Sequence, residues 1–193
     1  MTTAKRNTIV LVMLISAFVA MLNQTILNSA LPAIIKGLNI TETTAQWLIT
    51  GFMLVNGIMI PLTAFLMDKY TTRKLYIFSM AAFLIGSIIA ALSPGFEILM
   101  VARIIQAIGA GILLPLMQFT VFTLFPVEKR GFAMGLTGIV AQTAPAIGPT
   151  LTGLLIDFFS WRMPFYIVAA YAHIAYEIGL FLVENNGQTK ETV

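Results

Sequence analysis

Apolar residues fill this chain in six long runs, and short polar turns separate the runs. Each run can cross about 30 Å of hydrocarbon as a helix that rises about 1.5 Å per residue. Glycine, proline and polar residues gather between the runs, as is typical of turns. The pattern predicts an all-α membrane protein with six transmembrane spans, at residues 8–31, 46–67, 75–92, 98–125, 132–156 and 164–183.

The composition excludes a soluble domain. Of the 193 residues, 59% are hydrophobic and only 10% are charged, whereas soluble domains carry about a quarter charged residues. The chain has no cysteine and one histidine, so we expect no disulfide and no metal site. The net charge of +3 does not indicate nucleic acid, because the basic residues lie in short loops. We expect the lipid bilayer as partner and no cofactor.

Basic residues lie mostly on one side of the predicted spans. Only Lys36 and Arg162 fall on the other side, against the set Lys5, Arg6, Lys69, Arg73, Lys74, Lys129, Arg130 and Lys190. The positive-inside rule then predicts that both termini are cytoplasmic. The first span is too long for a signal peptide and lacks a good cleavage site, so we expect it in the mature protein. Residues 184–193 are expected to form a polar cytoplasmic tail or the start of an interdomain linker.

The ends of the second and fifth spans resemble each other. Asp68 is followed five residues later by Arg73, and Asp157 is followed five residues later by Arg162. One of these loops is expected in the cytoplasm and the other outside, so spans four to six would repeat spans one to three upside down. Inverted three-span repeats of this kind build the halves of many secondary transporters.

Arg103 is the strongest candidate for chemistry inside the membrane. Its guanidinium stays charged, and placing it in the middle of a span costs about 2.5–3.5 kcal/mol. Gln106 follows it, and Asn23 and Gln24 interrupt the first span at about the same depth, which favours a shared wall of a substrate or proton pathway. The alternatives are structural: Arg103 would cap the carbonyls of a kinked helix, and Asn23 would join two helices by a hydrogen bond worth about 0.6 kcal/mol.

A proline–glycine run interrupts the fifth span. Its members are Pro145, Gly148, Pro149 and Gly153. Proline breaks a soluble helix, but neighbouring helices can compensate for it in a membrane, where glycine also allows close packing. The run predicts a helix that bends or slides against a partner, as in a transporter.

Two further groups of residues suggest a gate and a proton path. Asp68, with Arg73 and Lys74, follows the second span. A carboxylate among bases at a helix end can act as a cytoplasmic gate, although a solvated positive-inside loop would explain the bases alone. On the sixth span, His173 and Glu177 share a helix face. Both can titrate, which makes them candidate proton carriers, and the alternative is a mutually satisfied pair.

Four segments of the chain resemble a known family. They are residues 22–32 (LDxTIVNVALP in the family), residues 64–74 (GxLaDRxGRK), Arg103 with Gln106 and Gly109 (RxxQGxG), and residues 138–153 with Trp161-Arg162 (the antiporter motif of the fifth span). On these motifs the chain resembles the N-terminal half of a major facilitator superfamily drug:proton antiporter. The similarity is to the fourteen-span group that includes exporters of lincomycin and quaternary ammonium compounds. Asn23 departs from the aspartate of many relatives, although the lincomycin-type subgroup shares asparagine.

The resemblance implies a multidrug efflux transporter of the bacterial cytoplasmic membrane. Such a protein exports amphipathic drugs by proton antiport, along a path between two halves. The chain ends where the interdomain linker is expected, so we expect a fragment or truncated half that is inactive alone and pairs with a second half of six to eight spans. A non-transporting membrane subunit or remnant is the alternative. An intramembrane serine protease is excluded because the predicted span at residues 98–125 contains no serine, so we expect no enzyme.

Overall fold

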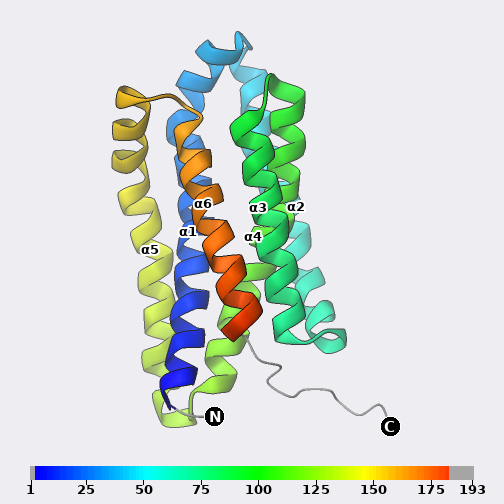
Figure 1. Cartoon of the computed structure of the whole chain (residues 1–193), viewed down its shortest axis with the longest axis vertical. Helices are drawn as coiled ribbons and strands as arrows, with labels where there is room; N and C mark the ends of the chain where they lie inside the picture. The colour runs from blue at the N-terminus through cyan, green and yellow to red at the C-terminus, as the bar shows by residue number, and fades with distance from the viewer. Residues whose placement is uncertain (1–2, 183–193) are drawn as a thin grey trace.

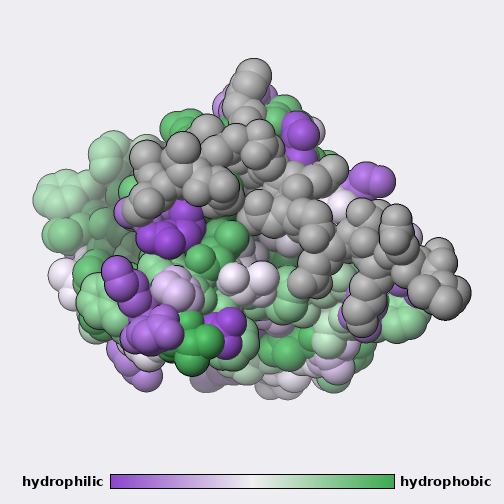
Figure 2. Space-filling view, turned by 90° about the horizontal axis from the view of Figure 1, so that it is seen from below, coloured by the Kyte–Doolittle hydropathy of each residue, from purple (hydrophilic) through white to green (hydrophobic). Residues whose placement is uncertain are grey.

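The computed structural model describes residues 3–182 and consists of six helices that run alternately up and down (Figure 1). The helices are α1 (Thr3–Leu38), α2 (Glu42–Lys69), α3 (Thr72–Leu92), α4 (Phe96–Leu124), α5 (Val127–Phe158) and α6 (Met163–Leu182). The start of α1, the α2–α3 and α4–α5 connections and the end of α6 lie at one end of the bundle (Figure 1). We call it the basic end, because its described residues include Arg6, Lys69, Arg73, Lys74, Lys129 and Arg130. Seen from this end, hydrophilic side chains lie among hydrophobic ones (Figure 2).

The helices extend beyond the apolar runs, because polar residues set their ends. α1 continues through the exposed Pro32 and ends before Asn39, whose φ of 52° is left-handed. The Ile40 amide donates to the Ile35 carbonyl at 3.2 Å, which closes the last turn. At the start of α2, Thr41 accepts a hydrogen bond from the Thr44 amide at 3.2 Å. The predicted tail, residues 184–193, lies outside the described residues.

Of the six described helices, α1 to α5 are long and apolar enough to cross a membrane. The sixth helix, α6, is the shortest at 20 residues and carries His173, Glu177 and three tyrosines. The prediction of an all-α membrane protein with six helices is confirmed.

Four helices form a layer in the order α5, α1, α4, α2, which we call the front layer, and α3 and α6 pack on the face of this layer that is turned toward the viewer in Figure 1. α1 packs on α5 and α4 packs on α2, while α3 rests on α4 and α6, and α6 also rests on α1. α2 and α3 hardly touch, although a short connection joins them. The hydrophobic core lies between the two layers. α1 and α4 therefore occupy the centre of the molecule, and α2 and α5 form its edges.

The helix packing follows the predicted inverted repeat. Exchanging α1, α2 and α3 for α4, α5 and α6 turns the α2–α4 contact into the α5–α1 contact. Two close approaches at glycines correspond as well: α2 meets α4 where Met59 faces Gly111, and α5 meets α1 where Gly148 faces Thr25. Met59 and Gly148 are separated by the same number of residues as the aspartates of the two repeats. The repeat predicted from a few residues is thus confirmed as a repeat of packing.

Two arginines tie α3 to α6 in a symmetric way. Arg73, in the first turn of α3, donates from Nη2 to the carbonyl of Leu180 near the end of α6. Arg162, just before α6, donates from Nη2 to the carbonyl of Ser93 at the end of α3, at 2.8 Å. Carbonyls at helix C-termini lack partners within their own helix, so each arginine satisfies one on the neighbouring helix. We call these contacts the arginine clamps.

Candidate functional site

A chain of polar side chains crosses from α4 to α3 inside the bundle. Arg103 and Gln106, both on α4, are 1% and 0% exposed. Nη1 of Arg103 donates to Oε1 of Gln106 at 2.9 Å, and Nε2 of Gln106 donates to Oγ of Ser87 on α3, also at 2.9 Å. The hydroxyl of Ser87 donates to the carbonyl of Phe83 at 2.7 Å. We call Arg103, Gln106 and Ser87 the arginine cluster, which buries two of the predicted pathway residues together.

The charge of the arginine cluster is compensated only in part. Cζ of Arg103 lies 4.1 Å from the ring centroid of Phe52 on α2, a cation–π contact. Nε of Arg103 is buried without a hydrogen-bond partner. In the described part of the chain, the guanidinium contacts a neutral amide and a ring, and it caps no helix carbonyl. This geometry differs from that of the arginine clamps, where each guanidinium binds a backbone oxygen.

Asn23 is buried on α1, the helix beside α4 in the front layer. It is 0% exposed, and neither its Nδ2 nor its Oδ1 has a partner among the described residues. An unsatisfied buried polar group costs about 1–3 kcal/mol, so a hydrogen-bonding ligand at this amide would be stabilised. Gln24, the next residue, is half-buried. The structure joins neither residue to the arginine cluster by a hydrogen bond.

Three residues near this region were not singled out in the sequence. Phe52 and Ser87 complete the surroundings of Arg103, and Asn56 on α2 has a buried Oδ1 without a partner, close to Gly111 of α4. Asn56 could have been found, because it is an amide in the middle of an apolar run. Phe52 and Ser87 carry no such signal, since phenylalanine and serine are ordinary residues in membrane helices.

The proline–glycine run lies within α5, which continues as one helix through Pro145 and Pro149. Both prolines are exposed, while Gly148 is buried against α1. A Cβ added at Gly148 would overlap with Oγ1 of Thr25 and lie 2.9 Å from Cβ of Thr25. Gly153 is exposed, and nothing lies within 4 Å of a Cβ added there. Within the run, therefore, Gly148 is the residue that permits close contact with α1.

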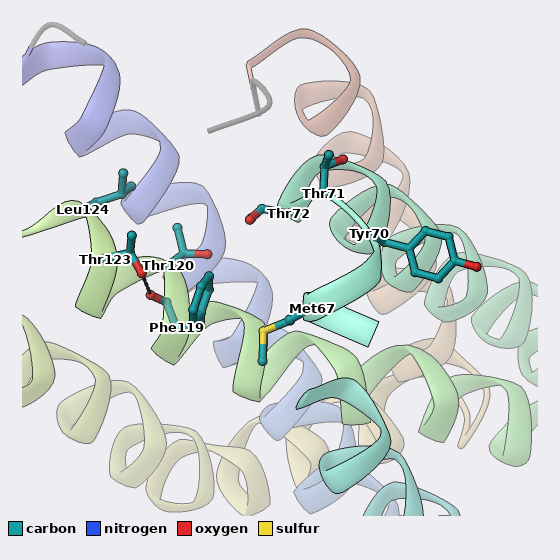
Figure 3. A pocket seen from close by; sticks show the side chains of 8 residues that line it. All are labelled: Met67, Tyr70, Thr71, Thr72, Phe119, Thr120, Thr123 and Leu124. Carbon is teal, nitrogen blue, oxygen red and sulfur yellow. Dashed lines mark hydrogen bonds between the residues drawn. The ribbon is translucent and has the colours of Figure 1, made fainter. Parts of the chain in front are cut away.

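The predicted gate residues lie at the basic end, but each has different surroundings. Asp68 is exposed at the end of α2, Arg73 forms a clamp with α6, and Lys74 is exposed in the first turn of α3. Figure 3 shows a small pocket beside them, with walls from Met67, Tyr70, Thr71, Thr72, Phe119, Thr120, Thr123 and Leu124. Its volume of about 30 Å³ has room for water but not for a drug.

His173 and Glu177 lie apart from the arginine cluster. Both are exposed on α6, one turn from each other, on the same face as Ile174, which is 57% exposed. The opposite face of α6 packs on α3 and α1. The structure therefore does not bring these two titratable side chains to Arg103 or Asn23.

The edges of the front layer leave much apolar surface uncovered. Only 17% of the apolar stretch of α5 and 28% of that of α2 are buried, whereas 56% is buried in α1 and in α4. The two uncovered helices flank the two helices that carry Asn23 and Arg103.

The sequence matches the model of the Major Facilitator Superfamily over residues 13–192. It is 50% identical, over 97% of its length, to the uncharacterized MFS-type transporter YcnB of Bacillus subtilis. It is 42% identical, over 94% of its length, to the lincomycin resistance protein LmrB of the same species. These alignments cover 40% of YcnB and 38% of LmrB, so the chain spans about two fifths of the length of these relatives.

Among solved structures, the fold is similar to a bacterial homolog of the human lysosomal transporter Spinster, in an inward-facing and unoccupied conformation. The TM-score is 0.77 at 17% sequence identity, and the match covers 98% of this chain and 47% of that one. At this identity the likeness shows the fold alone.

Proposed function

This chain belongs to the Major Facilitator Superfamily, whose members are transporters and not enzymes, and we propose that it forms one half of a drug exporter. The proposed substrates are amphipathic drugs. The 42% identity to a lincomycin resistance protein supports this class of substrate. We further propose a place in the bacterial cytoplasmic membrane with both termini in the cytoplasm, which the basic end of the bundle supports.

The buried, partly compensated charge of Arg103 is the observation that carries the proposal. Burying a guanidinium in a membrane costs about 2.5–3.5 kcal/mol, and such charges usually mark pathways. Gln106 and Phe52 hold the guanidinium in place, while the buried Nε has no hydrogen-bond partner among the described residues. In our proposal Arg103 either binds an anionic group or shifts the protonation equilibrium of groups in the transport path. The amides of Asn23 and Gln24 line this path.

The second half is the proposed partner of the uncovered edges. Burying apolar surface against other helices gains packing contacts that lipid tails supply less well. α2 and α5 offer the most uncovered surface of the five helices that can span the membrane. We propose that six to eight further spans cover them and close the path in front of α1 and α4.

Export is proposed to proceed by rocking of the two halves between inward and outward states, coupled to proton entry. Within this half, α5 would move along α1 where Gly148 faces Thr25, with Pro145, Pro149 and Gly153 allowing it to bend. Asp68 would contact the second half as a gate, while Arg73 and Lys74 hold the start of α3. His173 and Glu177 would carry protons at a place away from the arginine cluster.

Dye efflux tests the proposal. Bacteria that lack their own drug pumps are loaded with ethidium, and export is followed with this chain alone and with this chain co-expressed with the part of LmrB that the alignment does not cover. We expect no energised export from the chain alone, because it supplies one side of the path, and uncoupler-sensitive export from the pair. Robust export by the chain alone would contradict the need for a second half. An inserted but inactive pair would support the non-transporting alternative.

A further inference from the structure

An apolar groove opens on the side of the bundle between α2 and α3. α2 packs on α4, and α3 packs on α4 and α6. A gap therefore remains between α2 and α3, although a short connection joins them. The groove has a volume of about 530 Å³, and its walls include Leu62 and Leu66 of α2 and Leu75 and Phe78 of α3. Leu62 is 43% exposed and Phe78 is 55% exposed. The groove therefore faces outward and is not part of the core.

One positive charge lies at the basic end of this groove. Lys74 lines it together with Tyr70, which is 50% exposed. The two neighbouring bases are engaged elsewhere, since Nζ of Lys69 lies 4.4 Å from the ring centroid of Phe65 and Arg73 forms its clamp with α6. Lys74 is exposed, and its ammonium has no partner among the described residues.

The charges around Lys74 favour an anion. No acidic side chain lines the groove, and Asp68, at the end of α2, is the acidic residue closest to Lys74 in sequence. Each basic residue near a membrane surface gains about 1 kcal/mol from anionic lipid, which corresponds to about a fivefold preference for such a lipid at that site. Tyrosine hydroxyls also donate hydrogen bonds at the level of lipid headgroups. The groove thus combines an apolar trough with a cation and a hydroxyl donor at one end.

We propose that this groove binds an anionic phospholipid from the leaflet at the basic end of the bundle. One acyl chain lies between α2 and α3 along Leu62, Leu66 and Phe78, and the phosphate contacts Lys74 and Tyr70. A zwitterionic lipid fills the same trough but gains less from Lys74, because its own cationic group offsets the phosphate. The bound lipid braces α2 against α3, where the protein itself provides hardly any contact. This site is independent of the transport path proposed above.

Tryptophan quenching by brominated lipids tests the site directly. The full chain, with Trp47 and Trp161 replaced by phenylalanine and with Phe78→Trp, is placed in phosphatidylcholine bilayers with increasing phosphatidylglycerol. One of the two lipids carries bromine on its acyl chains. Quenching at the added tryptophan then reports which lipid occupies the groove. We expect phosphatidylglycerol to be enriched about fivefold over its share of the bilayer. When Lys74→Gln is added, the ratio of phosphatidylglycerol at the groove to its share of the bilayer should fall to about one. Lys74→Arg in its place should keep the ratio at about five.

A matched control lies on another helix. Ile174→Trp places a tryptophan on the exposed face of α6, in the half of the helix nearer the basic end, and there we expect no enrichment with either residue at Lys74. A phosphatidylglycerol enrichment ratio near one at Phe78→Trp, with Lys74 in place, would overturn the proposal. Enrichment that survives Lys74→Gln, or that is equal at Ile174→Trp, would assign the effect to the overall charge of the basic end and would overturn the assigned site.

Discussion

Arg103→Met should abolish transport while changing stability little. The substitution removes a hydrogen bond from a charged group, worth about 1.5–3 kcal/mol, and a desolvated cation–π contact worth about 2 kcal/mol. It also removes a guanidinium from the membrane interior, which returns about 2.5–3.5 kcal/mol. The net loss in the free energy of unfolding is then about 1–2 kcal/mol. The protein should therefore insert and fold, so that lost transport reports on the path.

Arg162→Met is the matched control. Arg162 also makes one hydrogen bond, at 2.8 Å to the carbonyl of Ser93, and its Cζ also lies 4.1 Å from a ring centroid, that of Trp161. It is half-buried at the end of a helix, so its removal returns little desolvation free energy. We expect Arg162→Met to lose about 2–3 kcal/mol of stability, more than Arg103→Met, yet to retain transport per folded molecule.

Thermal unfolding in detergent and dye efflux by the chain paired with a second half measure the two effects separately. The reasoning predicts opposite rankings: Arg162→Met is the less stable variant and Arg103→Met the less active one. Wild-type flux in Arg103→Met would remove Arg103 from the path. If Arg103→Met instead lost more stability than Arg162→Met, and flux fell only in proportion to folded protein, Arg103 would be a structural residue.

Three further substitutions, one of them a control, test the moving parts. Gly148→Ala should lower the free energy of unfolding by about 1–3 kcal/mol, because the added methyl group overpacks against Thr25, and it should also lower flux. Gly153→Ala has open space around it and should change neither quantity. Equal effects of the two substitutions in unfolding and efflux assays would refute the close-contact argument. Asp68→Asn should lower flux by shifting the balance of inward and outward states, measured as cysteine accessibility at the basic end. Unchanged accessibility and flux would leave Asp68 as an ordinary loop residue.

Much of the fold was predictable because a membrane imposes local rules. In lipid each backbone group must be satisfied within its own segment, so a long apolar run becomes a helix. The two aspartate–arginine pairs indicated the inverted repeat, but they did not reveal what the arginines bind. Arg73 was expected to act with Asp68 and instead clamps the carbonyl of Leu180. The acceptor lies on a helix more than a hundred residues away, where local spacing carries no information.

The sequence by itself determined the six helices, the family motifs and the Arg103–Gln106 contact, which follows from two residues three apart on one helix. The tertiary structure decided which residues meet across helices: Ser87 with Gln106, Phe52 with Arg103 and Thr25 with Gly148. The physical reason is the solvent. A helix in lipid is apolar on the face that packs and on the face that meets the bilayer, so hydrophobic periodicity does not show which face turns inward, and only the packing of distant segments fixes it.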